Sequence, residues 1–239
     1  MSNAQFVGVG VGPGDPELIT LKAMRLIQSA DVISYIANDK GESQAKRIAV
    51  EALQTVTREQ LEIPVVMPMC NDRSVANKVY DEAAASITEQ IQAGKQVVFI
   101  CEGDPLFFGS FAYLLERLQQ QFECSVVPGI SSVHAASSAL QHPLTMLKES
   151  FAVISGRHSD EQMRAALQQH DSVVIMKAGQ SRPRILAALK DCDRFEEARY
   201  LENIGRVNER MITDLSELED TAGPYFSLFV ITRSERDRT

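Results

Sequence analysis

The feature that most constrains the fold is a run of apolar residues without alternation, QVVFIC at 96–101. A strand with one face in water would alternate apolar and polar residues, so this strand must be covered on both faces. Helices that connect parallel strands provide such cover. Similar short apolar runs lie at 6–12, 31–36, 64–67 and 124–127, with helix-forming segments between them. We therefore expect an α/β fold whose first domain has a five-stranded parallel sheet.

The segment 15–30 predicts the first helix, with Asp15 as its N-cap and Pro16 as its first residue. Further helices are expected around 43–57 and near 109–121. The apolar residues expected to share a face of the first helix are Leu18, Leu21, Ile27 and Ala30. Residues that recur every fourth position predict one more helix, which Gly94 can end: Val75, Val79, Ala83, Ile87 and Ile91.

The second half of the chain has a different rhythm. Its last predicted strand follows the hydrophilic stretch 206–215 directly, which indicates a mixed sheet with an antiparallel ending. The connection QHPLTMLKES places a domain boundary near residue 145, giving domains 1–145 and 146–239. The strands expected in the second domain are 151–155, 172–178, 199–203 and 225–233.

Charge and composition exclude several classes of function. A formal net charge of −8 argues against binding long nucleic acids, which requires clustered Lys and Arg. A ligand rich in carboxylates would need a local basic rim. The chain has no apolar run of about 18 residues and no secretory signal, so we expect a cytoplasmic protein that does not bind a membrane.

The cysteines and histidines predict no protein-held metal. None of the four cysteines forms a CxxC pair, and the four histidines show no HExxH spacing. Buried, reduced thiols are the expected state of the cysteines, which are Cys70, Cys101, Cys124 and Cys192.

The glycine-rich segment at 8–23, GVGVGPGDPELITLKA, follows a strand and precedes a helix but is not a dinucleotide fingerprint. The GxGxxG template puts Pro13 or Asp15 at its last glycine. Pro13 lacks the N–H that binds a pyrophosphate, and Asp15 places negative charge where phosphate would lie. The loop instead offers close backbone approach and a rigid bend, suited to a flat or cationic ligand.

Two further motifs follow predicted strands: EGDPLFFGSFAYLLERL at 102–118 and VPGISSVHAASSALQHPL at 127–144. Together with the GPGDP loop, and in this order, they resemble the tetrapyrrole (corrin/porphyrin) methyltransferase family over nearly the whole chain. Within that family, FFGSFAYLLERL and the late PYFS are most similar to the precorrin-2 C-20-methyltransferases.

The resemblance implies methyl transfer from S-adenosylmethionine to a small-molecule tetrapyrrole, in an active-site cleft between two α/β domains of a homodimer. It implies C-20 of precorrin-2 or cobalt-factor II as the acceptor, in cobalamin biosynthesis. It names no catalytic base. The residues that match cofactor-lining positions of the family are Pro13, Gly103, Asp104, Phe107, Ser131, Ser132 and Met176. Glu102 replaces a glycine found in many relatives, and the second domain adds Ile204, Pro224 and Tyr225.

Several of these residues also have a structural interpretation. Asp104 can cap a helix after Pro105, and Ser131 and Ser132 can cap a helix that begins near Val133. Met176 fits an apolar core. Two or three basic residues of the second domain are expected to contact the carboxylates of the ring, among Lys148, Arg157, His158, Lys177, Arg182, Arg184 and Arg206.

Other functions remain open from the sequence. The same fold methylates other acceptors, such as uroporphyrinogen, later precorrins and a diphthamide precursor. A module that binds a cofactor without turnover is the alternative from another class.

Overall fold

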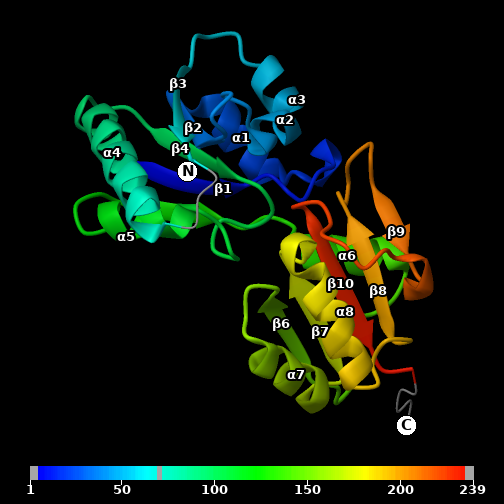
Figure 1. Ribbon diagram of the computed structural model, residues 1–239. Helices are drawn as coiled ribbons and strands as arrows, with labels where there is room; N and C mark the ends of the chain where they lie inside the picture. Colours follow the sequence, from blue (N-terminus) through cyan, green and yellow to red (C-terminus); the bar gives the residue numbers. More distant parts are fainter. Residues whose placement is uncertain (1–4, 69–71, 235–239) are drawn as a thin grey trace. The chain divides into compact units, whose positions relative to one another are not determined.

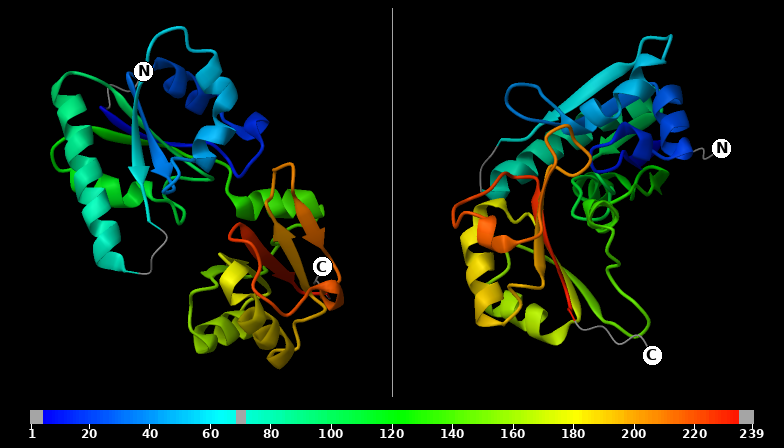
Figure 2. Two further views of the ribbon diagram at one scale, coloured as in Figure 1. Left: turned by 45° about the horizontal axis from the view of Figure 1, so that its top comes forward. Right: turned by 90° about the vertical axis from the view of Figure 1, so that its right-hand side faces the viewer.

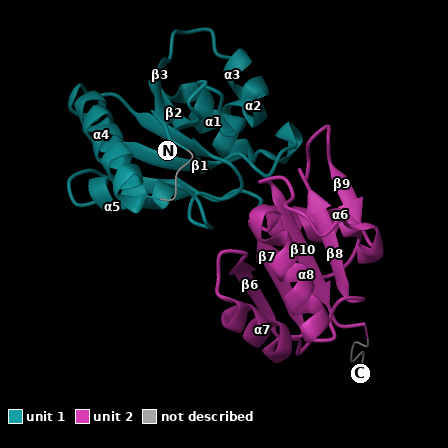
Figure 3. Ribbon diagram, viewed as in Figure 1, with its two compact units in different colours: residues 1–131 teal, residues 132–239 magenta. Residues whose placement is uncertain are grey.

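A computed structural model describes residues 5–68 and 72–234. The chain divides into two compact units, residues 1–131 and 132–239 (Figure 3). This division lies before the helix at 132–140, whereas the sequence places the boundary near residue 145. Cys70 and part of the expected loop at 67–73 lie outside the described residues.

Unit 1 contains a five-stranded, wholly parallel sheet of order β3-β2-β4-β1-β5, as predicted (Figure 1). Its strands are β1 (Phe6–Gly10), β2 (Val32–Ala37), β3 (Leu61–Val66), β4 (Val97–Cys101) and β5 (Cys124–Val127). Its helices are the 3₁₀ turn η1 (Pro16–Leu18), α1 (Leu21–Ser29), α2 (Gln44–Ile48), α3 (Val50–Gln54), α4 (Arg73–Gln92) and α5 (Phe111–Leu118).

Both faces of the central strands β1, β2 and β4 are buried, which explains their unbroken apolar runs. Val7 and Val9 of β1 pack into one core with α1, α2 and α3, whereas Phe6 packs into a second core with α4 and α5. The two views of Figure 2 show helices on both sides of the sheet. Successive strand residues point to opposite faces, so both sets must be apolar.

The predicted first helix is wrong at its start. The Asp15 carboxylate accepts from the Glu17 N–H at 2.9 Å and caps only the short turn η1. The helix α1 begins at Leu21, where the Thr20 hydroxyl accepts from a backbone N–H, because Ile19 and Thr20 adopt extended backbone angles. Leu21 is 78% exposed, so it does not belong to the buried face.

Two other boundaries in unit 1 also differ from the sequence prediction. The helix expected at 43–57 is two short helices, α2 and α3, that meet at Ala49. The strand β3 begins at Leu61, three positions before the predicted start. Val75, expected on the buried face of α4, is exposed near the start of that helix.

Unit 2 has a mixed sheet of order β6-β7-β10-β8-β9, in which only β6 and β7 are parallel. The predicted antiparallel ending is confirmed. The sequence predicted no element between the hydrophilic stretch 206–215 and the last strand, but β9 lies within this stretch and the 3₁₀ turn η3 begins at its end. The strands are β6 (Phe151–Ser155), β7 (Ser172–Met176), β8 (Ala198–Glu202), β9 (Arg210–Ile212) and β10 (Ser227–Thr232). The helices are α6 (Ser132–Leu140), α7 (Asp160–Gln169), η2 (Gly179–Ser181), α8 (Arg182–Asp191) and η3 (Leu215–Glu217).

No helix within the described ranges 5–68 and 72–234 is both long and apolar enough to cross a membrane. Three cysteines in these ranges are free thiols, of which Cys101 is buried and Cys124 and Cys192 are partly buried.

Candidate functional site

Three loops meet at the carboxyl edge of the first sheet, after the neighbouring strands β4, β1 and β5. The Val11 N–H donates to the Cys101 carbonyl at 2.9 Å, and the Gly103 N–H donates to the Gly12 carbonyl at 2.7 Å. These bonds join the GPGDP loop to the EGDP loop. Open parallel sheets bind ligands at this edge.

Glycines let the three loops touch through backbone atoms alone. A Cβ on Gly10 would lie 2.5 Å from the Gly103 oxygen and 2.6 Å from Gly129, and a Cβ on Gly129 would overlap the same oxygen. Gly103 also has a φ of 63°, a conformation that favours glycine. The result is a rigid backbone surface without side chains, which a flat ligand can approach closely.

Asp104 holds two of these loops together. Its Oδ1 accepts from the Leu106 N–H at 2.9 Å, and its Oδ2 accepts from the Gly129 N–H at 3.0 Å. Asp104 is not a helix N-cap, because α5 begins only at Phe111. It stabilises a turn and the adjacent loop instead. A carboxylate has about four acceptor sites, so it can still accept from a ribose hydroxyl.

The other residues that the sequence proposed in unit 1 lie in the same loops. Pro13 is buried next to Gly12, and a Cβ on Gly103 would lie 3.9 Å from Ser131. Glu102 is partly buried and precedes the bridge between Gly12 and Gly103. The Phe107 ring packs edge-on against Phe108, with 5.1 Å between their centroids.

The candidate residues of unit 2 gather at one end of the second sheet, except Ser132, which is the first residue of α6. Met176 ends β7 opposite Leu228 of β10. The Asn203 N–H, next to Ile204, donates to the Phe226 carbonyl at 2.8 Å. These contacts place Met176, Ile204, Pro224 and Tyr225 around the ends of three adjacent strands. Ile204 is buried and Tyr225 is 52% exposed.

Arg182 is buried at this end of the sheet and binds the loop before Pro224, a structural role that the sequence did not predict. Its Nε donates to the Thr221 carbonyl at 2.5 Å and its Nη2 to the Thr221 hydroxyl at 2.9 Å. Its Nη1 lies 3.6 Å from Glu202, and both side chains are buried. Arg182 therefore fixes the loop before Pro224, and its burial removes it from the residues that could meet a ligand. Nothing in the sequence SRPR distinguishes this arginine from its neighbours.

The chemistry available at the first edge is backbone donors and acceptors, the carboxylates of Glu102 and Asp104, and apolar rings. The adjacent Cys101 is a poor nucleophile, because burial strongly raises the pKa of its thiol. Among the residues that the structure describes, no three His, Cys, Asp or Glu side chains are grouped to hold a metal. Such a site can bind and orient a ligand.

Comparison with known proteins now decides the family. A family model described as Tetrapyrrole (Corrin/Porphyrin) Methylases matches residues 5–219. The chain belongs to this family. It is therefore a methyltransferase of the tetrapyrrole methylase type, as the three glycine-containing motifs predicted.

Two curated relatives are similar over almost their full length. A precorrin-2 C(20)-methyltransferase of a Sinorhizobium species is 33% identical, over 95% of this chain and 94% of the relative. A cobalt-precorrin-2 C(20)-methyltransferase of Salmonella typhimurium is also 33% identical, over 97% of both chains.

Solved structures share the fold. A cobalt precorrin-4 methyltransferase superposes with a TM-score of 0.73 at 20% identity, over 95% of this chain and 94% of the other. A uroporphyrin-III C-methyltransferase of Thermus thermophilus, complexed with S-adenosyl homocysteine, has a TM-score of 0.68 at 23% identity, over 96% and 97%. The two-sheet α/β architecture is thus that of tetrapyrrole methylases.

Proposed function

We propose that this protein transfers a methyl group from S-adenosylmethionine to C-20 of precorrin-2 or of its cobalt complex, in cobalamin biosynthesis. The observation that carries the proposal is the similarity to two relatives that are both named for this ring position. The similarity extends over more than nine tenths of every chain concerned, so it includes both units.

The loops at the carboxyl edge of the first sheet fit the methyl donor. Gly10 and Gly129 leave no room for a side chain, and the positive φ of Gly103 disfavours one, so the ligand would contact the backbone directly. Asp104 would accept from a ribose hydroxyl, and Phe107 would pack against an apolar part of the ligand. When bound, S-adenosylmethionine supplies an electrophilic methyl group on its sulfonium.

In the proposed reaction the protein mainly positions its reactants. The acceptor carbon must lie in line with the S–CH3 bond, at about 3 Å, in a site that excludes water. The carbon belongs to an electron-rich ring and attacks directly, after which it loses a proton. We assign no general base, because the ring can release this proton to a weak acceptor.

We propose that the methyl donor is also contacted by residues at the end of the second sheet and at the start of α6. These are Met176, Ile204, Pro224 and Tyr225 at the sheet, and Ser131 and Ser132 at the helix. The order of the residues around β7, β8 and β10 supports this assignment.

We further propose a cytoplasmic homodimer. In support, the edge strand β9 carries the exposed Met211, and an unpaired strand edge is suited to association. Light scattering of the purified protein gives its oligomeric state directly.

The decisive experiment is an anaerobic incubation with S-adenosylmethionine and either precorrin-2 or cobalt-sirohydrochlorin. We expect mass spectrometry to show one added methyl group, and NMR to place it at C-20. The faster substrate would indicate whether cobalt is present in the natural acceptor. If the protein binds the cofactor but methylates neither compound, the C-20 assignment is wrong and other acceptors of the family follow.

A further inference from the structure

Two cations stand side by side after the parallel strands of the second sheet. Ser155 ends β6 opposite Met176, which ends β7, so Arg157 and Lys177 follow the carboxyl ends of adjacent strands. The Gly156 N–H donates to the Met176 carbonyl at 2.7 Å. A Cβ on Gly156 would lie 2.9 Å from the Lys177 oxygen, so glycine is needed for the two loops to approach this closely.

The backbone holds Lys177 in a position that is unfavourable by itself. Its φ is 55°, in the left-handed region, which costs a residue with a Cβ about 1–2 kcal/mol. Burial, and secondly the charge of Arg157, lower the pKa of the Lys177 amine. Both effects disfavour the charged form, and an anion between the two groups would offset them. Strain and like charges gathered in one place are typical of functional sites.

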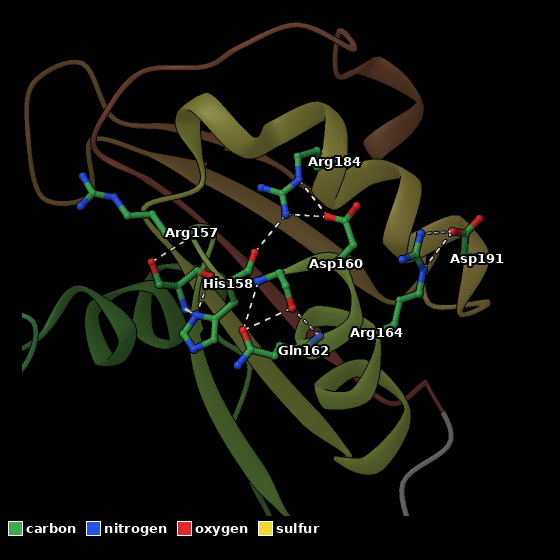
Figure 4. A network of polar contacts seen from close by, with 9 residues as sticks. Arg157, His158, Asp160, Gln162, Arg164, Arg184 and Asp191 are labelled. Atoms are coloured by element: carbon green, nitrogen blue, oxygen red, sulfur yellow. Dashed lines mark hydrogen bonds and ion pairs between the residues drawn. The ribbon is translucent and has the colours of Figure 1, made fainter. Parts of the chain in front are cut away.

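Nearby arginines already have acidic partners, whereas Arg157 extends away from them (Figure 4). Arg164 pairs with Asp191 at 2.8 Å, and Arg184 pairs with Asp160 at 2.5 Å. Among the residues that the structure describes, no carboxylate lies within ion-pair distance of Arg157. Of the basic residues that the sequence could not rank, Arg182 and Arg184 are thus engaged by acidic partners, whereas Arg157 extends away from them beside Lys177.

We propose that Arg157 and Lys177 together bind a carboxylate side chain of the tetrapyrrole substrate. The inference rests on the proposed function and names a binding subsite for it. It explains how a chain with a net charge of −8 accepts a ligand that carries several acetate and propionate groups. Arginine binds a carboxylate through two N–H groups, and lysine adds a point charge.

The carboxylate of S-adenosylmethionine is the other source of the same chemistry. The cofactor, however, also carries an ammonium and a sulfonium group, so its net charge is positive. Two adjacent cations would repel it, whereas they attract a polyanionic ring. Binding measurements on the two ligands separate these sources.

The test uses the full chain with Arg157→Gln and Lys177→Gln, the conservative Arg157→Lys and Lys177→Arg, and Arg164→Gln as a matched surface control. Binding of sirohydrochlorin is followed by its absorption band, and binding of S-adenosylhomocysteine by calorimetry. We expect each glutamine variant to weaken sirohydrochlorin binding about tenfold or more, as loss of a charged hydrogen bond does. S-Adenosylhomocysteine affinity should stay within about twofold, and the conservative variants should retain most of the ring affinity.

The outcomes are distinct. Weaker S-adenosylhomocysteine binding with unchanged sirohydrochlorin binding would assign the pair to the cofactor and overturn the proposal, as would no change in either affinity. If the wild-type protein binds sirohydrochlorin through these residues but methylates no tetrapyrrole, the subsite holds and the proposed function fails. If the wild-type protein does not bind sirohydrochlorin, both fail.

Discussion

At the scale of single residues, Asp104 has a structural role in the loops where we propose that the methyl donor binds. Its two oxygens already accept from Leu106 and Gly129, and these bonds hold the loops after β4 and β5 in contact. Gly129 in turn touches Gly10 and Gly103 through backbone atoms. A change at Asp104 therefore reaches the whole glycine surface.

The variant Asp104→Asn keeps the shape of the side chain and one acceptor, but loses the charge and one hydrogen bond. We expect the free energy of unfolding to fall by about 1 kcal/mol, the value of one hydrogen bond. We expect S-adenosylhomocysteine affinity to fall about tenfold, because the proposed contact with the ribose and the loop geometry are both weakened. Calorimetric titration and urea unfolding measure the two effects. Reduced stability with unchanged affinity would leave Asp104 a purely structural role.

At the scale of elements, a buried ion pair joins α8 to the end of β8, and hydrogen bonds from the same arginine hold the loop that leads into β10. The guanidinium of Arg182 lies between Glu202 and the backbone of Thr221, and its Cζ is 5.6 Å from the Tyr200 ring centroid. A Cβ on Gly223 would overlap the Tyr200 hydroxyl, so the loop lies directly on this cluster. The position of Pro224 and Tyr225 depends on it.

Replacing Arg182 by Met should be strongly destabilising, because the Glu202 carboxylate would stay buried without its partner. We expect a loss of about 3 kcal/mol in the free energy of unfolding, and partial recovery when Glu202→Gln is added. Urea unfolding of the single and double variants measures both values. Arg184→Met is the control, since its pair with Asp160 is exposed and should contribute less than about 1 kcal/mol. Equal losses in the single and double variants would contradict this account.

Element types were predictable where the pattern was strong, and boundaries were not. The unbroken apolar run of β4 predicted a parallel sheet, since only burial on both faces explains it. The start of α1 was missed because Asp15 and Pro16 form a local turn with the same signals as a helix start. β9 was missed because its residues are mostly exposed, and its pairing with β8 is a long-range effect that local pattern does not record.

For the candidate site, the motifs identified the three loops of unit 1, and parallel topology brought them to one edge. The sequence could not show which basic residues are available to a ligand. Arg182 and Arg157 have the same charge, but one is 5% exposed beneath a loop and the other extends into solvent beside Lys177. Only the three-dimensional partners distinguish them.

At the scale of the whole molecule, both sheets are held at their amino ends by an aspartate that precedes a strand. Before β2, Asp31 accepts from the Gln96 N–H at 2.9 Å and pairs with Arg58. Before β7, Asp171 accepts from the Ser150 N–H and hydroxyl, each at 2.8 Å. In each case the bond reaches the residue that precedes the neighbouring strand, β4 or β6, and so joins two adjacent strands.

These bonds make the stability of both units dependent on pH. The backbone hydrogen bond from Gln96 is the main cause that lowers the pKa of Asp31, and the one from Ser150 is the main cause for Asp171. A carboxyl group whose pKa is lower in the folded state stabilises the protein above its unfolded value of about 3.9. That contribution is lost as the pH falls from about 4 through the folded pKa.

We therefore expect Asp31→Asn and Asp171→Asn each to lower the free energy of unfolding at neutral pH by about 1 kcal/mol or less. Urea unfolding measures this change. The difference from the wild type should shrink as the pH is lowered below about 4, because the wild-type carboxyl is then protonated as well. Asp220→Asn, at an exposed aspartate, is the control. A difference that stays constant from neutral pH to about pH 3 would mean that shape and not charge joins these strands.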